Sequence, residues 1–158
     1  DQINKRDIME TASDPYFAVR VLLSITTFGC SIIPMLADFN KTHATNPLWT
    51  GHARYHVVWQ CLSYGWLGLF SFYLIWLHEG SSSTPLYISA FLCAAIYGGF
   101  FMTLMCIGLF DGKTHDENGY LPTEINLAGK TFFLDANVTV FSTMVALLAI
   151  ALYLLPEL

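Results

Sequence analysis

The sequence predicts an all-α integral membrane protein, a four-helix bundle with up-down-up-down topology, and three observations lead to this prediction. Of the 158 residues, 54% are hydrophobic and only 12% are charged, whereas a soluble domain carries about 25% charged residues. Aromatic residues make up 15% of the chain, as expected where Trp and Tyr line membrane interfaces. Four apolar stretches are also long enough to cross the bilayer, which takes about 20 residues in a helix. Residues 1–158 are therefore expected to form one multi-pass membrane domain.

The four expected helices cover about 16–37, 55–77, 85–110 and 131–155. The first has one charged residue, Arg20, whose long side chain can reach the interface, and the fourth has Asp135 in its first turns. Transmembrane β-strands would instead alternate in hydrophobicity over about 10 residues, which these stretches do not. The connections at 38–51, 78–84 and 111–130 are short enough to make successive helices antiparallel.

This topology brings the first and third connections to the same face of the membrane. Most of the polar residues that are able to carry chemistry lie in or beside these two connections, in a histidine-rich pattern. They are His43, His52, His56 and His115, with Asp38, Asp111, Asp116, Glu117 and Asp135. A functional site at this face is therefore expected.

Two polar stripes are expected to form the walls of that site. His52 and His56 are four residues apart at the start of the second helix and so share one helical face. This stripe continues with Gln60 and Ser63, and a matching one on the fourth helix is formed by Thr131, Asp135, Thr139 and Ser142. Polar groups at membrane depth are costly unless they face the bundle interior or a wet cavity. We therefore expect the two stripes to face each other.

Three interpretations of these residues remain open from the sequence. In a structural interpretation they cap helices and anchor the interface, with Asp38 and Arg54 as an ion pair. A metal site for Zn, Cu or non-haem Fe is a second interpretation, because imidazoles and a carboxylate suit these ions; its candidate ligands are His43, His52, His56 and Asp38. Metal-free acid–base catalysis is the third, with His52 or His56 moving a proton and Asp38 or Asp135 orienting the imidazole. In that case the candidates for substrate binding are Arg54, His43, Asn46, Trp49 and Gln60.

The first connection also carries a motif. The run D-x-N-x-T-H-x-x-N-P-x-W-x-x-H-A-R-x-H, from Asp38 to His56, resembles that of a family of small four-helix membrane proteins without an assigned activity. The resemblance implies the four-helix architecture. It singles out Asp38, Asn40, His43, Asn46, Trp49, His52, Arg54 and His56 without implying a reaction.

These observations favour a small membrane-embedded enzyme or binding protein for a lipophilic molecule. Proton transfer, as in an isomerase or hydrolase, is the expected chemistry, with metal-assisted oxidation second. The alternative is a non-catalytic accessory subunit of a larger membrane complex. Expected partners are membrane lipid, a lipophilic small molecule or other membrane subunits. Nucleic acid is not expected, because the net charge is −5 and no basic patch is present.

Overall fold

The computed structural model describes residues 14–78, 82–115, 119 and 121–155, and it confirms the all-α membrane bundle. Within these residues, four helices are long and apolar enough to cross a membrane. They are α2 (Phe17–Asp38), α3 (Gly51–Phe72), α4 (Thr84–Met105) and α5 (Ala136–Leu154). A π-helical segment, η1 (Tyr73–Leu77), extends α3, and a 3-10 turn, η2 (Ile107–Leu109), follows α4.

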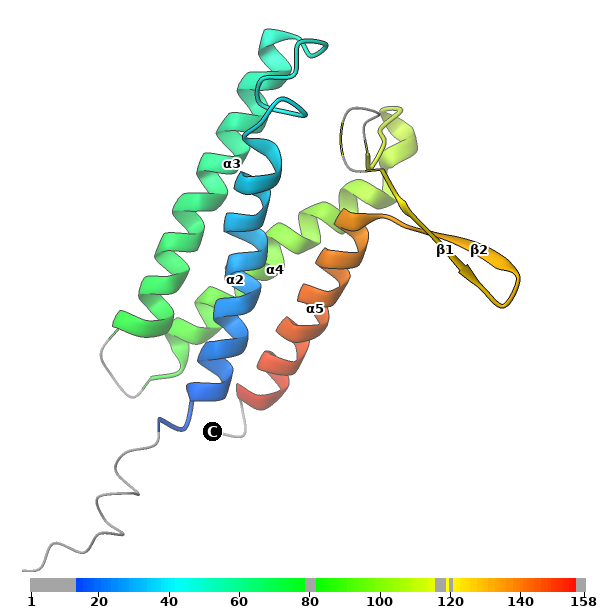
Figure 1. Ribbon diagram of the computed structural model, residues 1–158. Helices are drawn as coiled ribbons and strands as arrows, with labels where there is room; N and C mark the ends of the chain where they lie inside the picture. Colours follow the sequence, from blue (N-terminus) through cyan, green and yellow to red (C-terminus); the bar gives the residue numbers. More distant parts are fainter. Residues whose placement is uncertain (1–13, 79–81, 116–118, 120, 156–158) are drawn as a thin grey trace, which may run out of the picture.

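Helix α2 packs against α3, α4 and α5 and so holds the bundle together. The first and third connections lie at one end of the bundle, whereas α2 begins and α5 ends at the other (Figure 1). We call the first of these ends, which carries residues 39–50, 106–115 and 121–135, the loop end. The arrangement is the expected up-down-up-down topology. At the opposite end Arg20 Nε forms an ion pair with Asp14 Oδ2 at 2.7 Å.

The core lies where α2 and α4 cross, and it is held by close packing and by buried hydroxyl groups. Leu23 is fully buried there, and the Tyr97 hydroxyl of α4 donates a 2.6 Å hydrogen bond to the Thr26 carbonyl of α2. Between α2 and α3, Gly68 lies against Ser31 so closely that an added Cβ would collide with it. Small residues permit such close approach between helices in lipid, where packing rather than water exclusion holds helices together.

The fourth helix begins at Ala136 rather than at about 131, and the residues before it form a β-hairpin. Strand β1 (Thr123–Leu127) pairs antiparallel with β2 (Lys130–Leu134). Their two-residue turn is Ala128–Gly129, with φ of 49° and 75°, and positive φ at both positions is typical of the tight turn that matches strand twist. Thr131 therefore lies on a strand, and the stripe expected on the fourth helix loses that residue.

Helix α3 begins at Gly51 rather than at about 55, because the Thr50 hydroxyl accepts a 3.2 Å hydrogen bond from the Ala53 amide. From Gly51 to Leu77 the helix has 27 residues, or about 40 Å at 1.5 Å per residue. This exceeds the hydrocarbon core of about 30 Å. The first turns of α3 accordingly project past the end of α2, alongside residues 39–50 (Figure 1).

Candidate functional site

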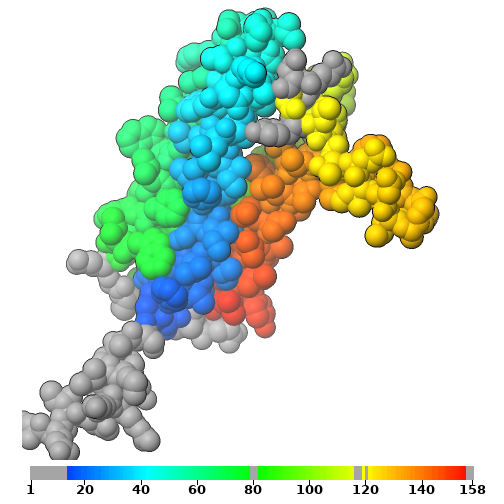
Figure 2. Space-filling view, in the orientation of Figure 1, coloured from blue at the N-terminus to red at the C-terminus, as the bar shows by residue number. Residues whose placement is uncertain are grey.

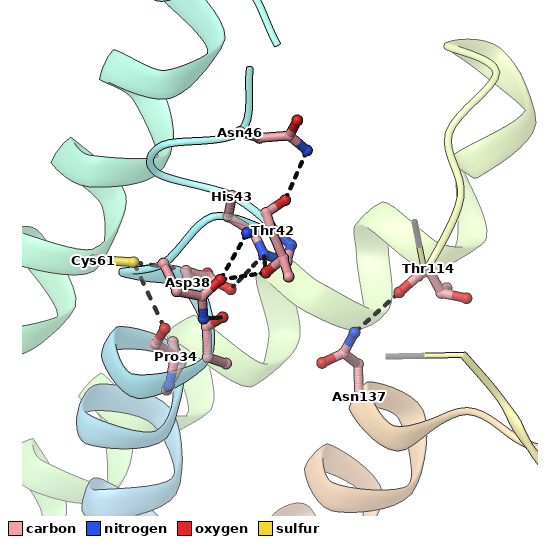
Figure 3. A network of polar contacts seen from close by, with 10 residues as sticks. Pro34, Asp38, Thr42, His43, Asn46, Cys61, Thr114 and Asn137 are labelled. Carbon is pink, nitrogen blue, oxygen red and sulfur yellow. Dashed lines mark hydrogen bonds and ion pairs between the residues drawn. The ribbon is translucent and has the colours of Figure 1, made fainter. Parts of the chain in front are cut away.

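Asp38 and His43 form an acid–imidazole pair at the loop end. Asp38 is the last residue of α2, and a tight turn brings the chain back over it, with the Ala44 amide donating to the Asp38 carbonyl at 2.9 Å. His43 Nδ1 then lies 3.6 Å from Asp38 Oδ1 (Figure 3). On the other side of the carboxylate, Cys61 Sγ of α3 lies 3.7 Å from Oδ2. The site thus begins where α2 ends against the middle of α3.

A chain of hydrogen bonds fixes which nitrogen of His43 carries the proton. Asn40 Nδ2 donates to the Ala37 carbonyl at 2.8 Å, and Asn40 Oδ1 accepts from the Thr42 amide at 2.8 Å and from the Thr42 hydroxyl at 2.6 Å. The one hydroxyl hydrogen of Thr42 is therefore used. At the 2.7 Å contact between Thr42 Oγ1 and His43 Nδ1, the ring must be the donor. Neutral His43 thus carries its hydrogen on Nδ1 and presents an unprotonated Nε2.

Asn46 and Trp49 hold this loop in place. Asn46 is 1% exposed; its Nδ2 donates to the Thr42 carbonyl at 2.9 Å and its Oδ1 accepts from the Leu48 amide at 3.0 Å. Both ends of the amide therefore hydrogen-bond to the backbone and stabilise the loop. Trp49 packs edge-on against the His43 ring, with 5.2 Å between the ring centroids.

A cavity of about 440 Å³ opens beside the Asp38–His43 pair, between all four helices. Its polar lining is contributed by Asp38, His43, Gln60, Tyr64, Thr103 and Asn137. The rest of the lining is apolar or carries no side chain, and consists of Ile33, Pro34, Ala37, Ile96, Gly99, Phe100 and Phe141. Ligand pockets have volumes of about 300–1,000 Å³, with a mostly apolar wall and a few polar groups. The cavity therefore has the size of a small-molecule site, and its lining is more polar than is usual, with six polar residues among thirteen.

The expected inward stripe on α3 is wrong for His52 and His56. Both side chains are exposed on the projecting turns of α3, where their Nε2 atoms lie 3.0 Å apart. The expected pairing of Asp38 with Arg54 is also not formed; in the described part of the chain the imidazole of His43 lies against Asp38 instead. The physical reason is that α3 starts four residues early, so these turns rise above α2 instead of packing on it. Of the expected stripe, Gln60 reaches the cavity wall.

Asp135 serves a different pair from the one expected. Its side chain accepts a 3.1 Å hydrogen bond from the Val138 amide and so caps α5, while its other oxygen lies 3.7 Å from His115 Nδ1. Asn137, the second residue of the same helix, donates to the Thr114 carbonyl at 3.0 Å (Figure 3). These contacts fasten the third connection to α5. Asp116 and Glu117 lie outside the described residues.

The candidate metal ligands do not assemble into one site. His43 and Asp38 form one pair, and His52 and His56 form another. Within the described residues, no group of three or more His, Cys, Asp or Glu side chains is arranged to hold a metal ion. Since a protein site for Zn²⁺ takes at least three such ligands, the expected set of His43, His52, His56 and Asp38 is divided between two places.

Several residues of the site were missed by sequence reasoning. Thr42 carries a signal, because a threonine two residues after an asparagine is typical of a side-chain-stabilised turn and it directly precedes His43. Asn137 carries another, as a polar residue in an otherwise apolar helix. Gly99 gives no signal, since its contribution is the absence of a side chain at the cavity wall. A comparison with protein-family models, with curated proteins and with solved structures finds no match.

Proposed function

We propose that this protein binds a lipophilic molecule with a polar group in the cavity beside Asp38 and His43, and that His43 exchanges a proton with the bound molecule. The observation that carries the proposal is the joining of an apolar wall, reaching toward the bilayer interior, to an acid–imidazole pair at the loop end. A molecule that enters from the membrane would place its apolar body between α2, α4 and α5. Its polar end would then meet the six polar groups of the lining.

The hydrogen-bond chain supports His43 as a general base. Nε2 is the unprotonated nitrogen, and no hydrogen bond to it occurs among the described residues. When Nε2 takes a proton from the bound molecule, the imidazolium retains its Nδ1 hydrogen, and Asp38 at 3.6 Å stabilises the new positive charge. His43 can then return the proton to a different atom of the same molecule. The net reaction is an isomerisation, which needs no further reactant.

Binding is tested by filling the cavity. Gly99 lines it and Gly98 does not, yet an added Cβ at either position meets nothing within 4 Å. Gly99→Leu and Gly98→Leu are therefore a matched pair, because the new Cβ meets no neighbouring atom at either position. We expect mass spectrometry of organic extracts to find a lipophilic species at near-stoichiometric amounts with the wild type and Gly98→Leu, and at much lower amounts with Gly99→Leu. Equal amounts in all three preparations would refute the cavity as the site.

Proton transfer is tested by incubating the extracted species with purified protein in deuterium oxide. We expect the wild type to introduce deuterium at carbon, and His43→Gln to reduce the rate by about 100-fold or more. His115→Gln is the matched control, because His115 also faces a carboxylate but does not line the cavity. If the species binds but takes up no deuterium, the protein binds it without catalysing proton transfer, and the catalytic part of the proposal is wrong.

A role as an accessory subunit is the alternative, and the outer face of α4 favours it. Ala94, Ala95 and Gly98 are exposed there, although small residues in this spacing usually let a second helix approach closely. Particle mass in mild detergent separates the two functions. The role as an accessory subunit would be supported if the protein purifies in a large complex that Gly98→Leu dissociates, and if the activity of that complex is unchanged by His43→Gln.

A further inference from the structure

The β-hairpin at 123–134 has two chemically different faces. All residues of both strands are exposed, and the hairpin projects sideways from the bundle beyond the start of α5 (Figures 1 and 2). Directly paired residues share a face of the ribbon. The pairs Thr123–Leu134, Ile125–Phe132 and Leu127–Lys130 therefore lie on one face. It is called the apolar face, because four of its six residues are apolar: Ile125, Leu127, Phe132 and Leu134.

The opposite face is mostly polar. The pairs Asn126–Thr131 and Glu124–Phe133 lie on it, and the Thr131 hydroxyl donates a 2.7 Å hydrogen bond to Asn126 Oδ1 across the strands. Lys130, which pairs with Leu127, lies not on this face but on the apolar one, next to the turn at the tip of the ribbon. An isolated two-stranded hairpin is marginally stable in water, so this ribbon needs a surface for its apolar face.

The length of α5 indicates where that surface is. The helix has 19 residues, or about 28 Å at 1.5 Å per residue, which is close to the roughly 30 Å of the hydrocarbon core. The whole of α5 is therefore needed to cross the core, and its first residue lies at the boundary with the headgroups. Asp135 alone separates β2 from α5. The base of the hairpin is consequently held at the level of the membrane surface.

We propose that the hairpin lies on the bilayer at the loop end, with its apolar face in the lipid and its polar face toward water. The occupant of the apolar face is lipid, because the ribbon runs sideways from a helix end that is fixed at the lipid boundary. Lys130 lies on the apolar face at its tip, and its long side chain can reach back to the lipid phosphate groups while its stem stays in the apolar layer. The hairpin thereby anchors the third connection, which carries His115 and Asp135, at a defined depth beside the cavity.

The test places an environment-sensitive nitrobenzoxadiazole label on each face of the hairpin in the full chain. Cys106 is exposed and is replaced by Ser, whereas Cys30, Cys61 and Cys93 are buried and escape labelling. Single cysteines are then introduced by Phe132→Cys and Thr131→Cys, and, as an independent pair on the other strand, by Ile125→Cys and Asn126→Cys. The proteins are reconstituted in phosphatidylcholine nanodiscs, with a quencher either in the lipid (doxyl phosphatidylcholine) or in water (iodide).

We expect doxyl lipid to quench the labels at 125 and 132 several-fold more strongly than those at 126 and 131, and iodide to give the reverse order. Equal access of iodide to all four labels would show that the hairpin stands in water, and would overturn the proposal. Labels at 125 and 132 shielded from both quenchers would also overturn it, because a protein surface, such as a second copy of this chain, would then cover the apolar face.

Discussion

Removing the hydroxyl group of Thr42 is expected to change the tautomer of His43. Thr42→Val keeps the shape of the side chain but deletes the oxygen that accepts the Nδ1 hydrogen at 2.7 Å. A hydrogen bond of this kind contributes about 1 kcal/mol, which corresponds to about a fivefold change in an equilibrium ratio. The ratio of the Nδ1–H to the Nε2–H form should therefore fall about fivefold, and the rate of deuterium incorporation should fall with the fraction that presents a free Nε2.

The tautomer is measured from the ¹⁵N shifts of the ring nitrogens in protein labelled on histidine, at a pH where the imidazole is neutral. The His43 signals are assigned from their loss in His43→Gln. Thr45→Val is the control, because Thr45 is an exposed threonine of the same loop and its side chain makes no hydrogen bond among the described residues. A wild-type protein with its proton mainly on Nε2, or an unchanged ratio in Thr42→Val, would refute the assignment of His43 as a prepared base.

Three further predictions concern stability, each measured by reversible unfolding in detergent. Replacing Gly by Ala in a helix gains about 1 kcal/mol of helix propensity, but at Gly68 the new Cβ collides with Ser31, and overpacking costs about 1–3 kcal/mol. Gly68→Ala should therefore destabilise the protein or leave its stability unchanged. Gly98→Ala should stabilise it, because the new Cβ there meets nothing within 4 Å. Effects of the same sign and size for both variants would contradict the close contact at Gly68. Asn46→Ala should lower the free energy of unfolding by about 1–3 kcal/mol, because it leaves backbone donors and acceptors of the loop unpaired. It should also speed the hydrogen exchange of the backbone amides in residues 40–48. Exchange at the wild-type rate there would show that another group holds the loop. Asp135→Ala should lower the free energy of unfolding by about 1 kcal/mol, because it removes the side chain that caps α5. Unchanged stability and an unchanged exchange rate of the Val138 amide would contradict this role of Asp135.

The helices were predictable because hydropathy and length are local properties of the sequence. Each spanning helix is an uninterrupted run of residues that needs no knowledge of its neighbours, and an even number of spans places the first and third connections at the same end. The hairpin was predictable in principle and was missed. The runs Thr123–Leu127 and Lys130–Leu134 are rich in strand-forming residues and are separated by two residues that end in Gly129, but the apolar Phe132–Leu134 run merges with α5 in a hydropathy reading.

The composition of the site was only partly accessible. Asp38, His43 and Gln60 were named as site residues, and they line the cavity. Their grouping was not predicted, because the spacing of His52 and His56 is a stronger sequence pattern than that of Asp38 and His43. Residues five apart at a helix end meet only when a particular turn folds back, and that turn depends on the side chain of Asn40.

The sequence by itself determined that this chain has four helices long and apolar enough to cross a membrane and that four of its five histidines lie at one end of the bundle, since both follow from the order of apolar and polar residues. Only the tertiary structure decided which of those groups meet. The height at which α3 passes α2 leaves His52 and His56 on projecting turns and brings Cys61 to Asp38, and the missing side chain of Gly99 leaves space between the helices. Heights and spaces of this kind arise from the packing of whole helices against one another, which no single stretch of sequence encodes.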